Sequence, residues 1–177
     1  MSLTHPFSIL VLEDASADGT PGQIIFTPCP GTKGIDVTTS LKQLAAAGAQ
    51  AILTLMPLEE MQRNDVADLS QQCKSLGLLW FHLPIEDDHA PENDFQNAWA
   101  TAKRAIHELL DAGKTLAIHC KGGSGRTGLV AAQILLERGM PLEQVIDKVR
   151  AIRPNALQLP VHQSYINQTA QDVDSCC

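Results

Sequence analysis

The sequence of 177 residues lacks the long apolar segments that mark a membrane protein. No apolar run approaches the ~20 residues that a membrane-spanning helix needs. The first residues have neither the basic nor the apolar region of a secretion signal. Residues 174–177, at the C-terminal end, form no prenylation motif. We therefore expect a cytoplasmic protein that has no membrane as its partner.

Basic residues are also scarce. The chain has 13 Lys and Arg against 20 Asp and Glu, which gives a net charge of −7 with histidine neutral. A protein with net negative charge is repelled by nucleic acid and by anionic membrane surfaces. The charge balance therefore argues against nucleic acid as the main partner.

The cysteines follow no pattern of a disulfide framework or a zinc site. Their number is odd, their spacing is irregular and there is no CxxC, and the histidines show no metal-ligand spacing. We expect reduced thiols, no metal and no cofactor. Oxidation could pair Cys73 reversibly with Cys120, but plain packing is the favoured interpretation of Cys73 and of Cys29. The five cysteines are Cys29, Cys73, Cys120, Cys176 and Cys177.

Short apolar runs alternate with helical patterns along the whole chain, without a long linker or a repeat. This alternation predicts a single domain over residues 1–177, with a three-layer α/β fold in which helices flank a mostly parallel central sheet. We expect it to be a monomer. The expected strands cover residues 7–12, 23–26, 51–55, 78–83 and 115–118. The expected helices cover residues 37–47, 57–63, 66–76, 95–109, 125–138, 141–152 and 160–172.

Functional sites in such sheets form at the carboxyl ends of the strands. The loop after the last expected strand reads HCKGGSGRTG over residues 119–128 and places Cys120 at the end of a buried strand. Three glycines among the next five residues let the backbone curl so that its N–H groups point inward. The loop then enters a helix N-terminus, which favours negative charge. These features predict a binding site for phosphate.

Side chains in the same loop add a nucleophile and a cationic clamp. Arg126 can offer a planar fork to two phosphate oxygens. The inward N–H groups, the helix N-terminus and Arg126, together called the cradle below, should stabilise a thiolate at Cys120. This thiolate would attack phosphorus and form a phosphocysteine. Thr127 would then donate a hydrogen bond to the departing sulfur, and His119 would orient the loop. The expected phosphate-binding residues are Lys121, Gly122, Gly123, Ser124, Gly125 and Arg126.

The pattern of His-Cys, five residues, Arg and then Thr resembles the signature of the Cys-based protein-tyrosine and dual-specificity phosphatase superfamily. The resemblance runs from about residue 23 to residue 166 and is strongest at the cysteine loop. Residues 30–33 and 153–158 are similar to the kinase-associated phosphatase branch. The resemblance implies a hydrolase of phosphoric monoesters that needs no cofactor.

The resemblance also implies a general acid. Residues 81–87, FHLPIED, look like the acid loop of that branch, which makes Asp87 the proton donor, with Glu86 and Asp88 as neighbouring alternatives. An alkoxide or phenolate leaves poorly without a proton, so the chemistry requires such an acid. The family often uses a glutamine to orient the hydrolytic water, and here Gln158 and Gln163 both remain open for this role.

The substrate we expect is a phosphorylated protein. Only 4% of the residues are aromatic, which argues against a deep slot for phosphotyrosine alone and favours a shallow pocket that also takes phosphoserine and phosphothreonine. A phosphatase of phosphoinositides or small phosphate esters is the alternative, weakened because Lys121 is the only basic residue of the loop besides Arg126. More distant alternatives are an inactive phosphoprotein-binding module, sulfur transfer and arsenate reduction.

Overall fold

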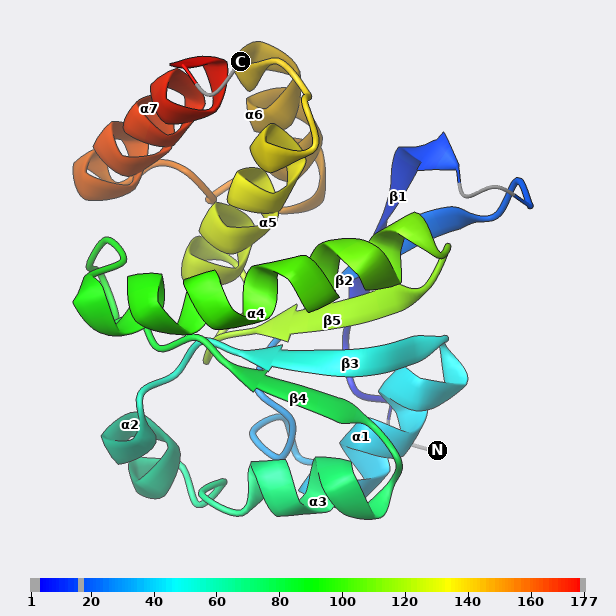
Figure 1. Cartoon of the computed structure of the whole chain (residues 1–177). Helices are drawn as coiled ribbons and strands as arrows, with labels where there is room; N and C mark the ends of the chain where they lie inside the picture. The colour runs from blue at the N-terminus through cyan, green and yellow to red at the C-terminus, as the bar shows by residue number, and fades with distance from the viewer. Residues whose placement is uncertain (1–3, 16–17, 176–177) are drawn as a thin grey trace.

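The computed structural model describes residues 4–15 and 18–175, so the expectations about Cys176 and Cys177 fall outside the described residues. A five-stranded sheet with the order β1-β2-β5-β3-β4 forms the centre (Figure 1). The strands are β1 (Ser8–Ala15), β2 (Pro21–Thr27), β3 (Ala49–Thr54), β4 (Leu79–His82) and β5 (Thr115–His119). All five expected strands are therefore present.

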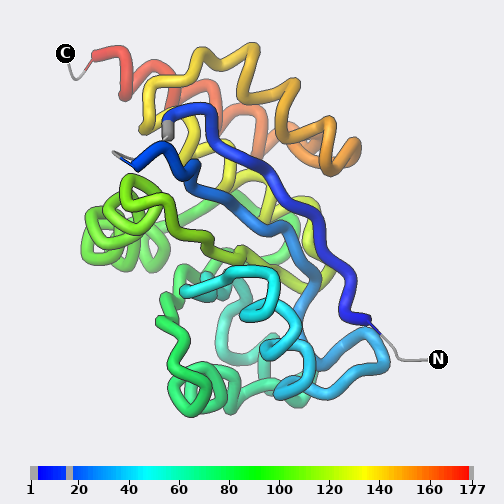
Figure 2. Tube along the Cα trace, turned by 90° about the vertical axis from the view of Figure 1, so that its right-hand side faces the viewer, coloured from blue at the N-terminus to red at the C-terminus, as the bar shows by residue number. Residues whose placement is uncertain are grey.

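Among the strands of the described residues, only β1 runs against its neighbour, since it pairs antiparallel with β2, and the other pairs are parallel. It lies along the outer edge of the sheet, beside β2 (Figure 2). Leu10 and Leu12 of β1 are buried whereas Ile9 and Val11 are exposed, as expected for a strand with one face toward the core. The prediction of a mostly parallel sheet is confirmed.

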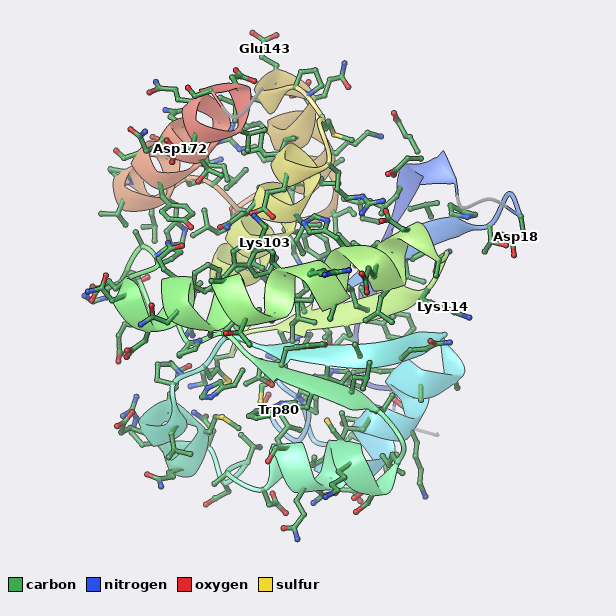
Figure 3. All side chains as sticks on the ribbon, viewed as in Figure 1. Asp18, Trp80, Lys103, Lys114, Glu143 and Asp172 are labelled. Atoms are coloured by element: carbon green, nitrogen blue, oxygen red, sulfur yellow. The ribbon has the colours of Figure 1, made fainter. Side chains whose placement is uncertain are left out.

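Helices cover both faces of the sheet (Figure 1). Alternate residues of each central strand point to opposite faces, and in β5 Leu116 and Ile118 pack toward one core while Ala117 packs toward the other. Figure 3 shows Trp80 of β4 on the side of α1 and α3, where it packs against the smaller core. The helices are α1 (Val37–Ala46), α2 (Leu58–Arg63), α3 (Leu69–Ser75), α4 (Asn93–Asp111), α5 (Gly125–Glu137), α6 (Leu142–Ile152) and α7 (Pro160–Ser175).

Local signals place most helix ends correctly. Asp36 caps α1, because its carboxylate accepts a hydrogen bond from the backbone N–H of Thr39 at 2.6 Å. The expected helix over residues 66–76 is shorter at its start, since α3 begins at Leu69. Val66 instead is buried, and its N–H bonds to the carbonyl of Met61 at the end of α2. Within the described part of the chain, no helix has the length and apolar character to cross a membrane.

The parallel strands end in register. Thr27, His119, Thr54 and His82 form one row across β2, β5, β3 and β4. The loops that leave these four strands therefore emerge at the same edge of the sheet. The cysteine loop is flanked there by the segments that follow β2, β3 and β4.

Candidate active site

Cys120 is the first residue after β5 and is 4% exposed. Its sulfur accepts hydrogen bonds from the backbone N–H of Gly123 at 3.2 Å and from the hydroxyl of Thr127 at 3.3 Å. Both donors favour negative charge on the sulfur. The cysteine lies in a cavity of about 390 Å³. The cavity is lined by Thr32, Lys33, Asp87, Asp88, Cys120, Lys121, Gly122, Ser124, Gly125 and Arg126.

The curl of the cysteine loop depends on Gly123. Its φ angle of +79° lies in the left-handed region, which glycine adopts without strain. A Cβ at this position would lie 2.5 Å from the carbonyl carbon of Thr27, so a side chain would push the loop away from the end of β2. The backbone of Cys29 holds the loop from the same side, through a 3.0 Å hydrogen bond from its N–H to the carbonyl of Lys121.

Arg126 is 3% exposed, and its guanidinium donates three hydrogen bonds to two residues. Nη1 and Nη2 donate to the two carboxylate oxygens of Glu60, each at 2.8 Å, and Nη1 also donates to the carbonyl of Ile85 at 2.9 Å. A guanidinium has five N–H groups. Among the described residues nothing accepts a hydrogen bond from Nε or from the second N–H of Nη2, so these two N–H groups form a fork, with a carboxylate oxygen of Asp87 3.5 Å from Nη2. Such a fork matches two phosphate oxygens.

The charge of this arginine is strongly favoured. Burial alone lowers the pKa of Arg126, but the hydrogen bonds to Glu60 and the neighbouring Cys120 outweigh it and raise the pKa above its usual value. Glu60 itself was missed in the sequence because it belongs to no motif. The only sequence signal is an acidic residue in the short helix that follows β3, at the same edge of the sheet as the cysteine loop.

The structure separates the three acidic candidates in the loop after β4. Asp87 and Asp88 line the cavity of Cys120, whereas Glu86 lines a neighbouring cavity. One carboxylate oxygen of Asp87 lies 3.5 Å from Nη2 of Arg126. The Asp87 side chain is 70% exposed, so a carboxyl group there can meet a substrate that enters from solvent.

His119 is fully buried and lies in a directed chain of hydrogen bonds. Its Nδ1 donates to the carbonyl of Cys120 at 3.0 Å, so its Nε2 accepts from the Thr54 hydroxyl at 2.7 Å, and that oxygen accepts from the indole N–H of Trp80 at 2.8 Å. Burial lowers the pKa of His119 to about 4, which keeps the ring neutral near pH 7. This geometry suits an orienting residue.

The two glutamines lie outside the cavity lining. The amide of Gln158 donates to the carbonyl of Pro154, and that of Gln163 donates to the carbonyl of Leu157, each at 3.2 Å. The loop after β2 instead contributes Thr32 and Lys33 to the rim.

Cys29 and Cys73 are both fully buried in the smaller core. Burial raises the pKa of each thiol to about 12. A thiol that stays protonated is a poor nucleophile. This supports packing as the role of both cysteines.

Comparison with protein families gives a match over most of the chain. A family model described as "Polymorphic toxin system, DSP-PTPase phosphatase" matches residues 31–140. The human (Homo sapiens) protein "Cyclin-dependent kinase inhibitor 3" is 33% identical over 149 residues, which cover 78% of this chain and 68% of that protein. The "Probable protein tyrosine phosphatase type IVA B" of Dictyostelium discoideum is 34% identical over 108 residues, which cover 56% of this chain and 66% of that protein.

Solved structures share the fold. The crystal structure of kinase associated phosphatase with its catalytic-site cysteine changed to serine has a TM-score of 0.83, with 23% identity and 99% of both chains covered. The crystal structure of PTPMT1 in complex with PI(5)P has a TM-score of 0.68, with 15% identity and coverage of 86% of this chain and 93% of that one. Both comparisons agree with the three-layer α/β fold.

The Glu60–Arg126 pair yields a prediction about stability. Glu60→Ala leaves a buried guanidinium without its counter-charge, which typically costs roughly 3–5 kcal/mol. We expect that loss in the free energy of unfolding, measured by urea denaturation at pH 7. Glu59→Ala is the matched control, because Glu59 is the exposed neighbour on the same helix and its loss should change stability by less than ~0.5 kcal/mol. Equal effects of the two substitutions would contradict the assignment.

Proposed function

Because this chain belongs to the DSP-PTPase phosphatase family, whose members are Cys-dependent protein-tyrosine and dual-specificity phosphatases, we propose that Cys120 is its nucleophile and that Asp87 is its general acid. One observation carries the proposal. Cys120, Arg126 and Asp87 all line one cavity of about 390 Å³, and a carboxylate oxygen of Asp87 lies 3.5 Å from Nη2 of Arg126.

In the first step, the inward N–H groups of the cysteine loop and the fork of Arg126 hold the non-bridging oxygens of the phosphate. The Cys120 thiolate attacks phosphorus, so an S–P bond forms while the P–O bond to the substrate breaks. Asp87, protonated at this stage, gives its proton to the departing oxygen. The products are a phosphocysteine and the free hydroxyl of the substrate.

In the second step, a water molecule attacks the phosphocysteine. The Asp87 carboxylate takes the proton of that water, and Thr127, 3.3 Å from the sulfur, donates a hydrogen bond to the thiolate as the S–P bond breaks. Inorganic phosphate leaves and the thiolate is restored. Gln158 and Gln163 stay alternatives for orienting the water, and His119 holds the loop through the carbonyl of Cys120.

The partner in this proposal is a phosphorylated protein. The described residues that line the cavity include no aromatic side chain, which supports a pocket open to phosphoserine and phosphothreonine as well as phosphotyrosine. Lys33 and Lys121 add positive charge at the rim, but Asp87 and Asp88 oppose it, which disfavours a polyphosphorylated headgroup. Since one chain supplies every group named above, we propose a monomer that acts in the cytoplasm, where thiols stay reduced.

Substrate class can be tested with a panel of phosphate esters. We expect kcat/KM for phosphotyrosine and phosphothreonine peptides to exceed that for soluble phosphoinositides and sugar phosphates by at least ~10-fold, for the electrostatic reason given above. The Cys120→Ser variant supplies the blank, because a serine hydroxyl stays protonated at neutral pH and should give no turnover. A preference for phosphoinositides would contradict the proposed substrate class but keep the nucleophile.

The role of Asp87 can be tested through the leaving group. Asp87→Ala should lower kcat/KM for phosphopeptides by ~10²–10⁴, the usual contribution of a general acid. An activated aryl phosphate, such as a fluorinated methylumbelliferyl phosphate, should be affected far less because its leaving group needs no proton.

Asp88→Asn is the control, since Asp88 lines the same cavity and asparagine tolerates the left-handed backbone at this position, where φ is +61°. If only the Asp88 variant showed the loss that depends on the leaving group, the acid would be Asp88. If neither variant showed it, neither aspartate of the loop after β4 would be the acid.

A further inference from the structure

The loop that carries Asp87 is held at two carbonyl groups, one on each side of the aspartate. Before it, the carbonyl of Ile85 accepts from Nη1 of Arg126 at 2.9 Å. After it, the carbonyl of His89 accepts from Nε2 of His162 at 2.8 Å. The first donor belongs to the phosphate-binding loop, whereas the second comes from the first turn of α7, a helix that follows the acid loop by about 70 residues.

The backbone between these two points needs such support. Asp88 has a φ angle of +61°, a left-handed conformation that is unfavourable for residues other than glycine. A residue in this region persists only where the surroundings hold it. The turn is closed by the N–H of His89, which donates to the carbonyl of Glu86 at 3.1 Å, and by its Nδ1, which donates to the carbonyl of Asp87 at 2.7 Å.

The Asp87 side chain has little to fix it directly. It is 70% exposed, and its charged partner is Nη2 of Arg126 at 3.5 Å. In the proposed mechanism, that nitrogen donates to a phosphate oxygen when the substrate is bound. The position of the carboxyl group therefore depends on the backbone of the turn. A displacement of about 1 Å at a reacting group can cost ~10² in rate.

His162 lies where it can link the acid loop to the cradle. It is 1% exposed, unlike an exposed histidine that samples several rotamers. A Cβ on Gly125 would lie 3.9 Å from Cε1 of His162, so the ring also borders the start of α5. In Figure 1 the first turn of α7 lies beside the loop that leads into α4, which is the acid loop.

We propose that His162 is a positioning residue that holds Asp87 over Cys120 by donating a hydrogen bond to the carbonyl of His89. This inference rests on the proposed role of Asp87 as general acid. A buried histidine that only stabilised the fold would affect all substrates alike, whereas a residue that acts through the acid affects those whose leaving group needs a proton.

The test compares two variants of similar volume. His162→Leu removes the donor, and we expect kcat/KM for a phosphothreonine peptide to fall by ~10-fold to ~10², with less than a twofold change for the activated aryl phosphate. His162→Gln keeps an N–H donor on a flexible side chain and should recover most of the loss. Thermal unfolding of each variant reports whether it is folded, and His162→Phe replaces the leucine variant if that one is not.

A double variant separates this proposal from the proposed function. In an Asp87→Ala background, His162→Leu should lower kcat/KM for the peptide by less than twofold more, because the group it positions is gone. A full additional loss, or equal losses for both substrates in the single variant, would overturn the role of His162 and leave Asp87 as the acid. If Asp87→Ala itself shows no dependence on the leaving group, the proposed acid fails, and His162 has no acid to position.

Discussion

The buried ion pair between Arg126 and Glu60 is the contact on which the candidate site depends. Removing either partner leaves an uncompensated charge in the interior, which is far more costly than losing an exposed pair. The pair joins α2 to the cysteine loop, and the third bond of the guanidinium, to the carbonyl of Ile85, joins both to the acid loop. One side chain thus fixes a helix and two loops that are far apart in sequence.

The sheet makes this convergence possible. Parallel strands in register bring Thr27, His119, Thr54 and His82 into one row, so the loops that follow them share an edge. The neutral ring of His119 adds a second fixed contact, because its Nδ1–H points at the carbonyl of Cys120 and its Nε2 is held by Thr54. The cradle is therefore shaped before any phosphate arrives, which is how oriented dipoles stabilise developing charge without reorganisation.

Local patterns were enough to predict the elements and the cradle. Apolar runs located the strands, and the spacing of Cys120, Arg126 and Thr127 located the candidate site. These signals work because they concern neighbours along one chain segment.

Contacts between segments that are distant in the sequence could not be predicted from local patterns. Glu60 lies 66 residues from Arg126, and His162 lies 73 residues from His89, and neither belongs to a spacing pattern. The sequence pattern predicts a helix from residue 66, but α3 begins at Leu69. Val66 is instead buried in the smaller core, which is a tertiary effect. The choice between Gln158 and Gln163 depends on where a water binds, which no local pattern encodes.

The central claim is that phosphate passes through the sulfur of Cys120. The most direct measurement is rapid acid quench of the Asp87→Ala variant during turnover of an activated aryl phosphate, followed by mass spectrometry of its peptides. Loss of the residue that activates water should let the intermediate accumulate. The account predicts one phosphoryl group on the peptide that contains Cys120, and none after Cys120→Ser. A phosphoryl group on another residue, or turnover without any labelled peptide, would contradict it.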